Sequence, residues 1–300
     1  MAASRFGVLR KLCLTLEMIK FEHSVFALPF ALTSALLAMR ETGLNAQAGL
    51  GKLAWIVVAM VGARSAAMTF NRIADADLDA RNPRTATRHL PAGLLSRRFA
   101  WAFLGVSVAV FLLAARALNP LCLKLAPLAL VLLLGYSYTK RFTTLSHLVL
   151  GLCLGAAPAA AWIAVEGALD ARILWLTAAV ALWTAGFDIL YACQDYEFDV
   201  REGLRSLPAR VGIARALWLA RALHALVPPC LVALALSFHL GVLSLAGVAA
   251  IAGLLAYEHR LVKPDDLSRV NSAFFAVNGY VSVLFFLFWG AEILGLGARG

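Results

Sequence analysis

Long apolar stretches that follow one another along the sequence constrain this chain more than any other feature. A helix needs about 20 consecutive apolar residues to cross a bilayer, and this sequence offers many such stretches rather than one anchor. We predict nine spans, with approximate limits at 24–40, 53–71, 98–118, 120–137, 145–165, 172–193, 212–236, 240–257 and 272–295. We therefore expect an all-α fold, a polytopic membrane bundle of nine transmembrane helices.

Basic residues are unevenly divided between the loops that connect these spans. The net charge is +10, and a strongly basic balance can indicate nucleic-acid binding. Here, however, the positive side chains gather before the first span and after each even-numbered one. They are Arg5, Arg10, Lys11, Lys20, Arg81, Arg84, Arg88, Arg97, Arg98, Lys140, Arg141, Arg201, Arg205, Arg210, Arg260, Lys263 and Arg269. Such loops face the cytoplasm, so we predict a multi-pass protein of the cell inner membrane with a cytoplasmic N-terminus and no nucleic-acid partner.

Two acidic clusters stand at the ends of the second and sixth predicted spans. Their members, each four residues from the next, are Asn71, Asp75 and Asp79 in the first cluster and Asp195 and Asp199 in the second. Positions four apart share one face of a helix, so each cluster should form a single stripe, and Asp188 and Tyr191 extend the second stripe. Acidic residues at the edge of a span are costly and usually functional.

The two stripes indicate a divalent-metal site. Carboxylate oxygens suit Mg²⁺, which typically binds one or two carboxylates together with the phosphate oxygens of a substrate. We therefore predict that Asn71, Asp75, Asp79, Asp195 and Asp199 hold Mg²⁺, with a diphosphate bridging the two clusters. The alternative is that these acids form ion pairs with neighbouring arginines at helix ends. Asp77 points away from the first stripe, so we expect it to face solvent or to pair with a loop arginine.

A diphosphate also needs cationic contacts besides the metal, and arginine offers paired donors for them. Candidates near the predicted cytoplasmic span ends are Arg72, Arg84, Arg88, Lys140 and Arg205. The positive-inside bias, which places basic residues in these loops whatever the chemistry, is the alternative for each. At the entrance of the first span, Glu22 and His23 are candidates for orienting a polar aromatic substrate or acting as a base, or they are interface-facing residues.

At these motifs the chain resembles the UbiA superfamily of intramembrane aromatic prenyltransferases, over nearly its whole length. The segments that carry the resemblance are NRIADADLDARNPRTATRHLPAG (71–93), YSYTKRFTTLSHLVLG (136–151) and FDILYACQDYEFDVREGLRSLPARVG (187–212). The first and third are similar to the family's two aspartate motifs, and the second to its Y-x-x-x-K-R segment. The resemblance implies one transmembrane prenyltransferase domain over residues 1–300, a nine-helix bundle with a lateral opening to lipid.

The resemblance also implies a reaction, the Mg²⁺-dependent transfer of a polyprenyl group from polyprenyl diphosphate to an aromatic acid in ubiquinone or menaquinone biosynthesis. Carried over by position, the two acidic clusters would bind Mg²⁺–diphosphate, and Arg84, Arg88, Lys140 and Arg205 would contact the diphosphate. Asp188 and Tyr191 would line the cavity near the acceptor, and Arg72 is grouped with these catalytic candidates. Asp188 and Glu22 are the candidates for the base that removes the ring proton.

The acceptor is the part of this expectation that the motifs leave open. RHLPAG (88–93) replaces the R-P-L-P-S-G common in the ubiquinone enzymes, and FD replaces YD at 187–188, but neither change removes a metal ligand. IKFEHSVFALPFAL (19–32) and YEHRLVKPDDLSRVN (257–271) look most like a 4-hydroxybenzoate polyprenyltransferase-like subgroup associated with the futalosine route to menaquinone. The resemblance therefore implies 4-hydroxybenzoate or a dihydroxynaphthoic acid as the acceptor.

Other functions predict other patterns. A membrane transporter would place ionisable residues deep within its spans, whereas the acids here gather at span ends. A CDP-alcohol phosphotransferase would carry a compact D-G-x-x-A-R signature, which this sequence lacks. Within the superfamily, a haem O synthase and a lipid-ether synthase are the alternatives.

Overall fold

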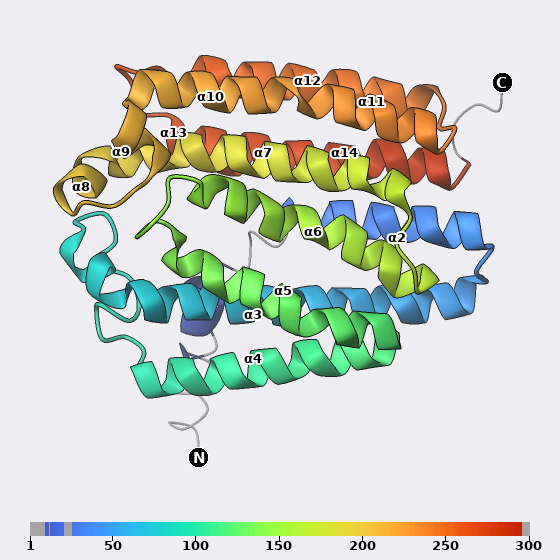
Figure 1. Cartoon of the computed structure of the whole chain (residues 1–300), viewed down its shortest axis with the longest axis horizontal. Helices are drawn as coiled ribbons and strands as arrows, with labels where there is room; N and C mark the ends of the chain where they lie inside the picture. The colour runs from blue at the N-terminus through green and yellow to red at the C-terminus, as the bar shows by residue number, and fades with distance from the viewer. Residues whose placement is uncertain (1–9, 12, 21–25, 296–300) are drawn as a thin grey trace.

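The computed structural model describes residues 10–11, 13–20 and 26–295. Within these ranges helices are the regular secondary structure, and the only β-type pairing is an isolated bridge between Lys263 and Asp266. Figure 1 shows the long helices running side by side in one bundle. The predicted all-α bundle is thus confirmed.

Among residues 26–295, ten longer helices build the bundle. They are α2 (Leu28–Thr42), α3 (Ala46–Arg81), α4 (Arg97–Leu118), α5 (Pro120–Thr139), α6 (Ser146–Glu166), α7 (Leu174–Ala192), α10 (Ile213–Ala225), α11 (Val227–Ser237), α12 (Val242–Leu261) and α14 (Asn278–Ile293). Short elements complete the chain: η2 (Ala171–Ile173), η3 (Cys193–Asp195), α8 (Tyr196–Arg201), α9 (Leu207–Val211), α13 (Val270–Ser272) and the π-helical turn η4 (Ala273–Val277).

The number of spans differs slightly from the expected nine. Eight helical stretches in the part of the chain that the structure describes are long and apolar enough to cross a membrane, and they match the last eight predicted ranges. The first range, 24–40, corresponds to α2, which has 15 residues and is therefore about 22 Å long. A hydrocarbon core of about 30 Å exceeds that length. Nevertheless α2 packs within the same bundle, against α6 and α14.

Tight connections at one end of the bundle are set by local sequence. Asn45 caps α3 by accepting a 2.9 Å hydrogen bond from the backbone N–H of Ala48. Asn119 caps α5 in the same way, accepting a 2.8 Å hydrogen bond from the backbone N–H of Cys122. Short polar side chains are preferred at the N-terminal cap of a helix. Gly43 and Gly167 end α2 and α6 with φ of +63° and +85°, a left-handed conformation that glycine adopts at little cost.

The opposite end of the bundle carries the longer connections, and we call it the loop end (left in Figure 1). It consists of residues 82–96, 140–145, the 193–212 segment with α8 and α9, and residues 262–269. These are the basic loops of the sequence, and they lie at the same end of the bundle. Helix α3, with 36 residues, is about 54 Å long, and its last turns bring the first acidic cluster to this end.

Apolar side chains cover both the inside and the outside of the bundle. Its largest core cluster includes Trp183, Phe285 and Trp289, all at most 1% exposed. On the outer surface, large side chains such as Val131 and Leu236 are 71% and 67% exposed. Exposed apolar area is unfavourable in water but not in the hydrocarbon core of a membrane, so such a surface is suited to contact with lipid. The molecule is therefore an integral membrane protein.

A buried polar chain joins three helices within this apolar core. The indole N–H of Trp183 donates to Asn278 Oδ1 at 2.7 Å, and Asn278 Nδ2 donates to Glu258 Oε1 at 2.7 Å. Asn278 and Glu258 are both fully buried. Each partner in the chain depends on Asn278, because an unmade hydrogen bond in an apolar interior leaves a desolvated polar group without compensation.

We predict that Asn278→Ala destabilises the protein by about 1–3 kcal/mol, because it leaves the Trp183 indole and the Glu258 carboxyl unsatisfied. The unfolding midpoint of the detergent-solubilised protein measures the effect. Asn271→Ala, which truncates an exposed side chain on the preceding turns, serves as the control and should change stability by less than about 0.5 kcal/mol. Equal effects of the two substitutions would contradict the polar chain.

Candidate functional site

A single large cavity, of about 1090 Å³, extends from the loop end into the bundle. It lies among α3, α4, α5, α6 and α7, and eleven of the twelve predicted site residues line it. The eleven are Asn71, Arg72, Asp75, Asp79, Arg84, Arg88, Lys140, Asp188, Tyr191, Asp195 and Asp199. Residues from three separate motifs, spread between positions 71 and 199, therefore meet at one place.

Asp75 is the most heavily paired acid of the first stripe. Its side chain is 3% exposed. Oδ2 accepts hydrogen bonds from Lys140 Nζ at 2.7 Å and from Asn71 Nδ2 at 3.2 Å, and Oδ1 accepts one from Arg141 at 3.2 Å. Arg141 is expected from its sequence position only to mark topology, and its contact with Asp75 adds it to the site. Its position directly after Lys140 was the available signal.

Asp79, one turn further along α3, holds the loop that follows. Arg88 donates to Asp79 Oδ1 at 2.7 Å, and the Thr85 hydroxyl donates to the Asp79 backbone carbonyl at 3.0 Å. These bonds fold residues 82–96 back over the end of α3. Asp79 Oδ2 is buried and has no hydrogen-bond partner among the described residues, which is a position where a cation could bind.

The second acidic cluster is joined to the first loop by an arginine. Arg84 donates from Nε to Asp195 Oδ1 at 2.8 Å and from Nη2 to Oδ2 at 2.5 Å, while Asn82 adds a 3.0 Å bond to Oδ1. Arg84 also donates to the Tyr191 hydroxyl at 3.1 Å. Burial lowers the pKa of the Arg84 guanidinium, but the hydrogen bond and charge of Asp195 outweigh burial and raise the pKa overall.

The second stripe is not one continuous α-helix, which corrects the expectation from its 3-4-4 spacing. Helix α7 ends at Ala192, the 3₁₀ turn η3 follows, and Asp199 lies on the separate short helix α8. A 3₁₀ turn tightens the chain at a helix end, and here it coincides with the paired bonds that hold Asp195 to Arg84. Asp199 remains buried, at 7% exposure, and still lines the cavity.

Arg205 is the one predicted residue that does not line the cavity. Its guanidinium donates to the backbone carbonyl of Phe142 at 2.9 Å, and its own backbone N–H donates to the backbone carbonyl of Lys140 at 2.8 Å. Arg205 thus joins the 193–212 segment to the α5–α6 connection. Glu22 and His23 lie outside the described residues, whereas Asp77 behaves as predicted: its side chain is 85% exposed and pairs with Arg97.

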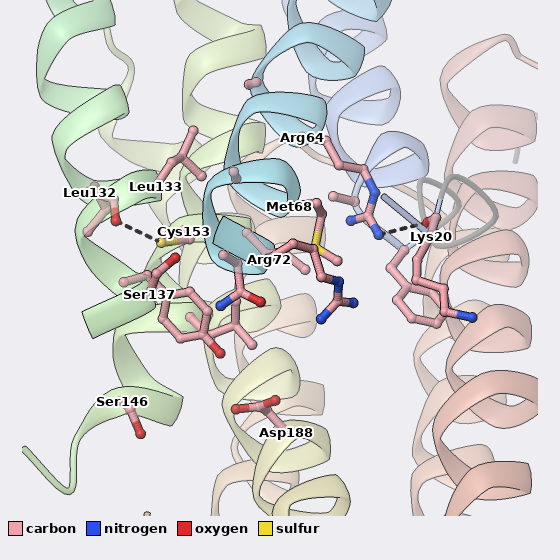
Figure 2. Close-up of a pocket in the computed structure, with 18 of the residues that line it drawn as sticks. Lys20, Arg64, Met68, Arg72, Leu132, Leu133, Ser137, Ser146, Cys153 and Asp188 are labelled. Atoms are coloured by element: carbon pink, nitrogen blue, oxygen red, sulfur yellow. Dashed lines mark hydrogen bonds between the residues drawn. The ribbon is translucent and has the colours of Figure 1, made fainter. Parts of the chain in front are cut away.

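Arg72 and Asp188 face the cavity from two helices, α3 and α7 (Figure 2). Arg72 is 8% exposed, and its Nε donates to the backbone carbonyl of Met18 at 3.3 Å. Asp188 Oδ2 lies 2.6 Å from Nδ1 of His147, a cavity-lining histidine on α6. His147 is not among the predicted site residues, although an ionisable side chain within a predicted span was a signal for it.

Beyond these polar groups the walls of the cavity become apolar. Residues of α3, α4, α5 and α6 line this part, among them Ile56, Met60, Phe111, Leu118, Leu125 and Ala161. One cavity thus combines a polar region at the loop end with an apolar region inside the bundle. This arrangement fits a ligand with an anionic head and a long apolar tail.

The polar region has donors suited to Mg²⁺. Four carboxylates and one amide supply hard oxygen atoms, and the buried Asp79 Oδ2 has no other partner among the described residues. Among the residues that the structure describes, no three His, Cys, Asp or Glu side chains lie close enough together to hold an ion. Basic side chains instead pair with Asp75, Asp79 and Asp195. These are the helix-end ion pairs that the sequence offered as the alternative, so metal binding would require the carboxylates to exchange partners.

Comparison with known proteins relates the whole bundle to one family. The model of the UbiA prenyltransferase family matches residues 27–289. The 4-hydroxybenzoate octaprenyltransferase of Aliivibrio fischeri is 32% identical over 238 residues, which cover 79% of this chain and 82% of that relative.

Solved structures agree with this relation. The apo structure of a UbiA homologue from Aeropyrum pernix has a TM-score of 0.80 and 34% identity, covering 91% of this chain and 98% of that chain. A UbiA homologue from Archaeoglobus fulgidus bound to DMAPP and Mg²⁺ has a TM-score of 0.73 at 21% identity, covering 93% and 99%. The latter likeness concerns the fold.

The Arg84–Asp195 ion pair should stabilise the folded protein more than an exposed pair of the same type. We predict a coupling free energy of about 1 kcal/mol or more from a double-mutant cycle with Arg84→Met and Asp195→Asn. The same cycle with Arg97→Met and Asp77→Asn, whose side chains are 59% and 85% exposed, should give less than about 1 kcal/mol. Chemical unfolding in detergent provides the measurement. A coupling at Arg84–Asp195 no larger than that at Arg97–Asp77 would contradict the bidentate contact.

Proposed function

The chain belongs to the UbiA prenyltransferase family, and on that basis we propose that this membrane prenyltransferase transfers a polyprenyl group from polyprenyl diphosphate to an aromatic acid in quinone biosynthesis. The observation that carries the proposal is the single cavity in which acidic and basic side chains meet at one end and apolar walls continue inward. A polyprenyl diphosphate has the same division between charge and apolar tail.

The two acidic clusters would hold the metal. Asn71, Asp75, Asp79, Asp195 and Asp199 all line the polar region and provide oxygen donors. When bound, Mg²⁺ would supply positive charge that stabilises the diphosphate as a leaving group. The ion pairs of the clusters support this assignment. When Mg²⁺ binds a carboxylate, the basic side chain that was paired with it would become available, and that side chain already lies where the diphosphate would bind.

The basic side chains would bind the diphosphate. Arg84, Arg88 and Lys140, joined by Arg141, each contact a carboxylate of the clusters. Fixed cations placed where negative charge develops lower the barrier to breaking the allylic C–O bond. The positive charge on the prenyl carbon then meets the electron-rich ring of the acceptor, and the apolar walls exclude the water that would quench it.

The acceptor would bind between α3 and α7. Arg72 is a buried cation on one side of the cavity and can pair with the carboxylate of an aromatic acid. Asp188 lies on the other side, where it can accept the ring proton, and Tyr191 adds an aromatic wall that contacts Phe274 at a centroid distance of 4.3 Å. The relatives named 4-hydroxybenzoate octaprenyltransferase favour 4-hydroxybenzoate as acceptor, with a dihydroxynaphthoic acid as the second candidate.

The distribution of basic loops supports one orientation in the membrane. The loop end carries the basic connections, and such loops remain on the cytoplasmic side. We therefore propose that the enzyme spans the inner membrane as one domain over residues 1–300, with the polar region of the cavity open toward the cytoplasm. The aromatic acid would enter from there, while the prenyl tail would enter from the bilayer.

We predict that the purified protein prenylates 4-hydroxybenzoate or 6-carboxy-1,4-naphthalenediol when given Mg²⁺ and farnesyl or a longer prenyl diphosphate. Asp75→Ala and Asp195→Ala should each lower kcat about 100-fold or more, because each removes a charged contact needed in the transition state. Product formation by chromatography and mass spectrometry is the measurement.

Asp77→Ala is the matched control, because Asp77 lies on the same helix as Asp75 but faces away from the cavity. It should keep wild-type turnover. If no aromatic acid is prenylated, the proposed function is wrong; if Asp75→Ala and Asp195→Ala keep full turnover, the function stands but the metal assignment is wrong.

A further inference from the structure

His147 links Asp188 on α7 to the start of α9. It lies on the first turn of α6, is 5% exposed, and lines the cavity. Its Nδ1 lies 2.6 Å from Asp188 Oδ2 on α7, and its Nε2 lies 3.2 Å from the backbone nitrogen of Leu207 at the start of α9. Both ring nitrogens therefore have partners.

These two partners decide which nitrogen carries the proton. The backbone N–H of Leu207 can only donate, so Nε2 must present its lone pair. In the neutral imidazole the proton then resides on Nδ1, which donates it to the Asp188 carboxylate. The 193–212 segment thus fixes the tautomer of His147, and the tautomer fixes the direction of the bond to Asp188.

The bond to His147 leaves one oxygen of Asp188 available. Oδ2 accepts from His147, whereas none of the described residues donates a hydrogen bond to Oδ1. The Asp188 side chain is 18% exposed and points into the cavity (Figure 2). A carboxylate held at one oxygen and open at the other is suited to accept a proton from a molecule bound beside it.

We propose that His147 is a positioning residue that orients the Asp188 carboxylate so that Oδ1 accepts the ring proton of the aromatic acceptor; this inference rests on the proposed function. In the reaction, the allylic C–O bond breaks and its electron pair leaves with the diphosphate. A C–C bond forms between the prenyl carbon and the ring, and the C–H bond at that ring carbon returns its electrons to the ring as the proton passes to Oδ1. His147 keeps its own proton on Nδ1 throughout.

A purely structural role for His147 would consist of holding α9 against α6 through Leu207. Two substitutions separate the roles. In His147→Gln the side-chain amide can still donate to Asp188 and accept from Leu207, because it carries both an N–H donor and a carbonyl oxygen. In His147→Leu neither bond can form, although the residue remains a good helix former of similar bulk.

We predict that His147→Leu lowers kcat about 10- to 100-fold, the same loss that follows when a partner that orients a metal-binding side chain is removed. The KM for the prenyl diphosphate should change by less than about twofold, since the diphosphate contacts are untouched. His147→Gln should recover most of the lost turnover. Steady-state kinetics of the full-length protein in detergent, with each substrate varied in turn, provides the measurement.

A second arm tests whether His147 acts through Asp188. In an Asp188→Asn background, adding His147→Leu should cause little further loss of kcat, because residues that act as a unit are not additive. Thermal unfolding checks that each variant is folded. If His147→Leu unfolds, His147→Met replaces it, since a flexible apolar side chain adapts to the same space.

An unchanged kcat in His147→Leu, or losses that multiply in the double variant, would overturn the positioning role. Failure of His147→Gln to recover turnover, in a protein that unfolds at the wild-type temperature, would overturn it as well. A wild-type protein that prenylates no aromatic acid would instead refute the proposed function, and this inference with it. Activity of the wild type therefore separates the two failures.

Discussion

The fold depends on keeping ionised carboxylates stable at the edge of an apolar bundle. Removing one such charge from water costs several kcal/mol unless partners compensate it. Here Asp75, Asp79 and Asp195 each receive a charge-assisted hydrogen bond from a basic side chain of another segment. These bonds fold residues 82–96 over the end of α3 and tie that loop to the turn after α7. The loop end is therefore organised by charge, whereas the rest of the bundle is organised by apolar packing.

The same pairs place each carboxylate beside a basic side chain, an arrangement suited to binding a metal ion together with an anion. An arginine or lysine that pairs with a carboxylate can instead bind an anion such as a diphosphate. The carboxylate is then free to bind a metal cation. In the proposed function, Mg²⁺ and a diphosphate would enter together, so the net charge of the region would change little. The apolar part of the cavity would hold the prenyl tail and keep water from the reacting carbon.

Much of this arrangement could be predicted from local sequence. Apolar runs predict where the helices lie. The four-residue spacing of Asn71, Asp75 and Asp79 predicts that they share one face of α3. Both predictions succeed because each depends only on residues within a single helix. The remaining features depend on contacts between elements. The spacing of Asp195 and Asp199 suggested one helix, whereas η3 interrupts it where Asp195 meets Arg84. Arg205 donates to the backbone carbonyl of Phe142, and His147 hydrogen-bonds to Asp188 on α7 and to Leu207 on α9. No spacing rule encodes these choices, because they follow from where other segments pack.

The central claim is that the cation–carboxylate pairs at the loop end exchange partners for Mg²⁺ and a diphosphate. A structure of the protein with Mg²⁺ and a prenyl thiolodiphosphate, whose C–S bond resists cleavage, tests it most directly. We predict that in this complex Asp75, Asp79 and Asp195 contact the metal while Arg84, Arg88 and Lys140 contact the diphosphate. Carboxylates that keep their present basic partners, with the diphosphate bound elsewhere, would contradict it.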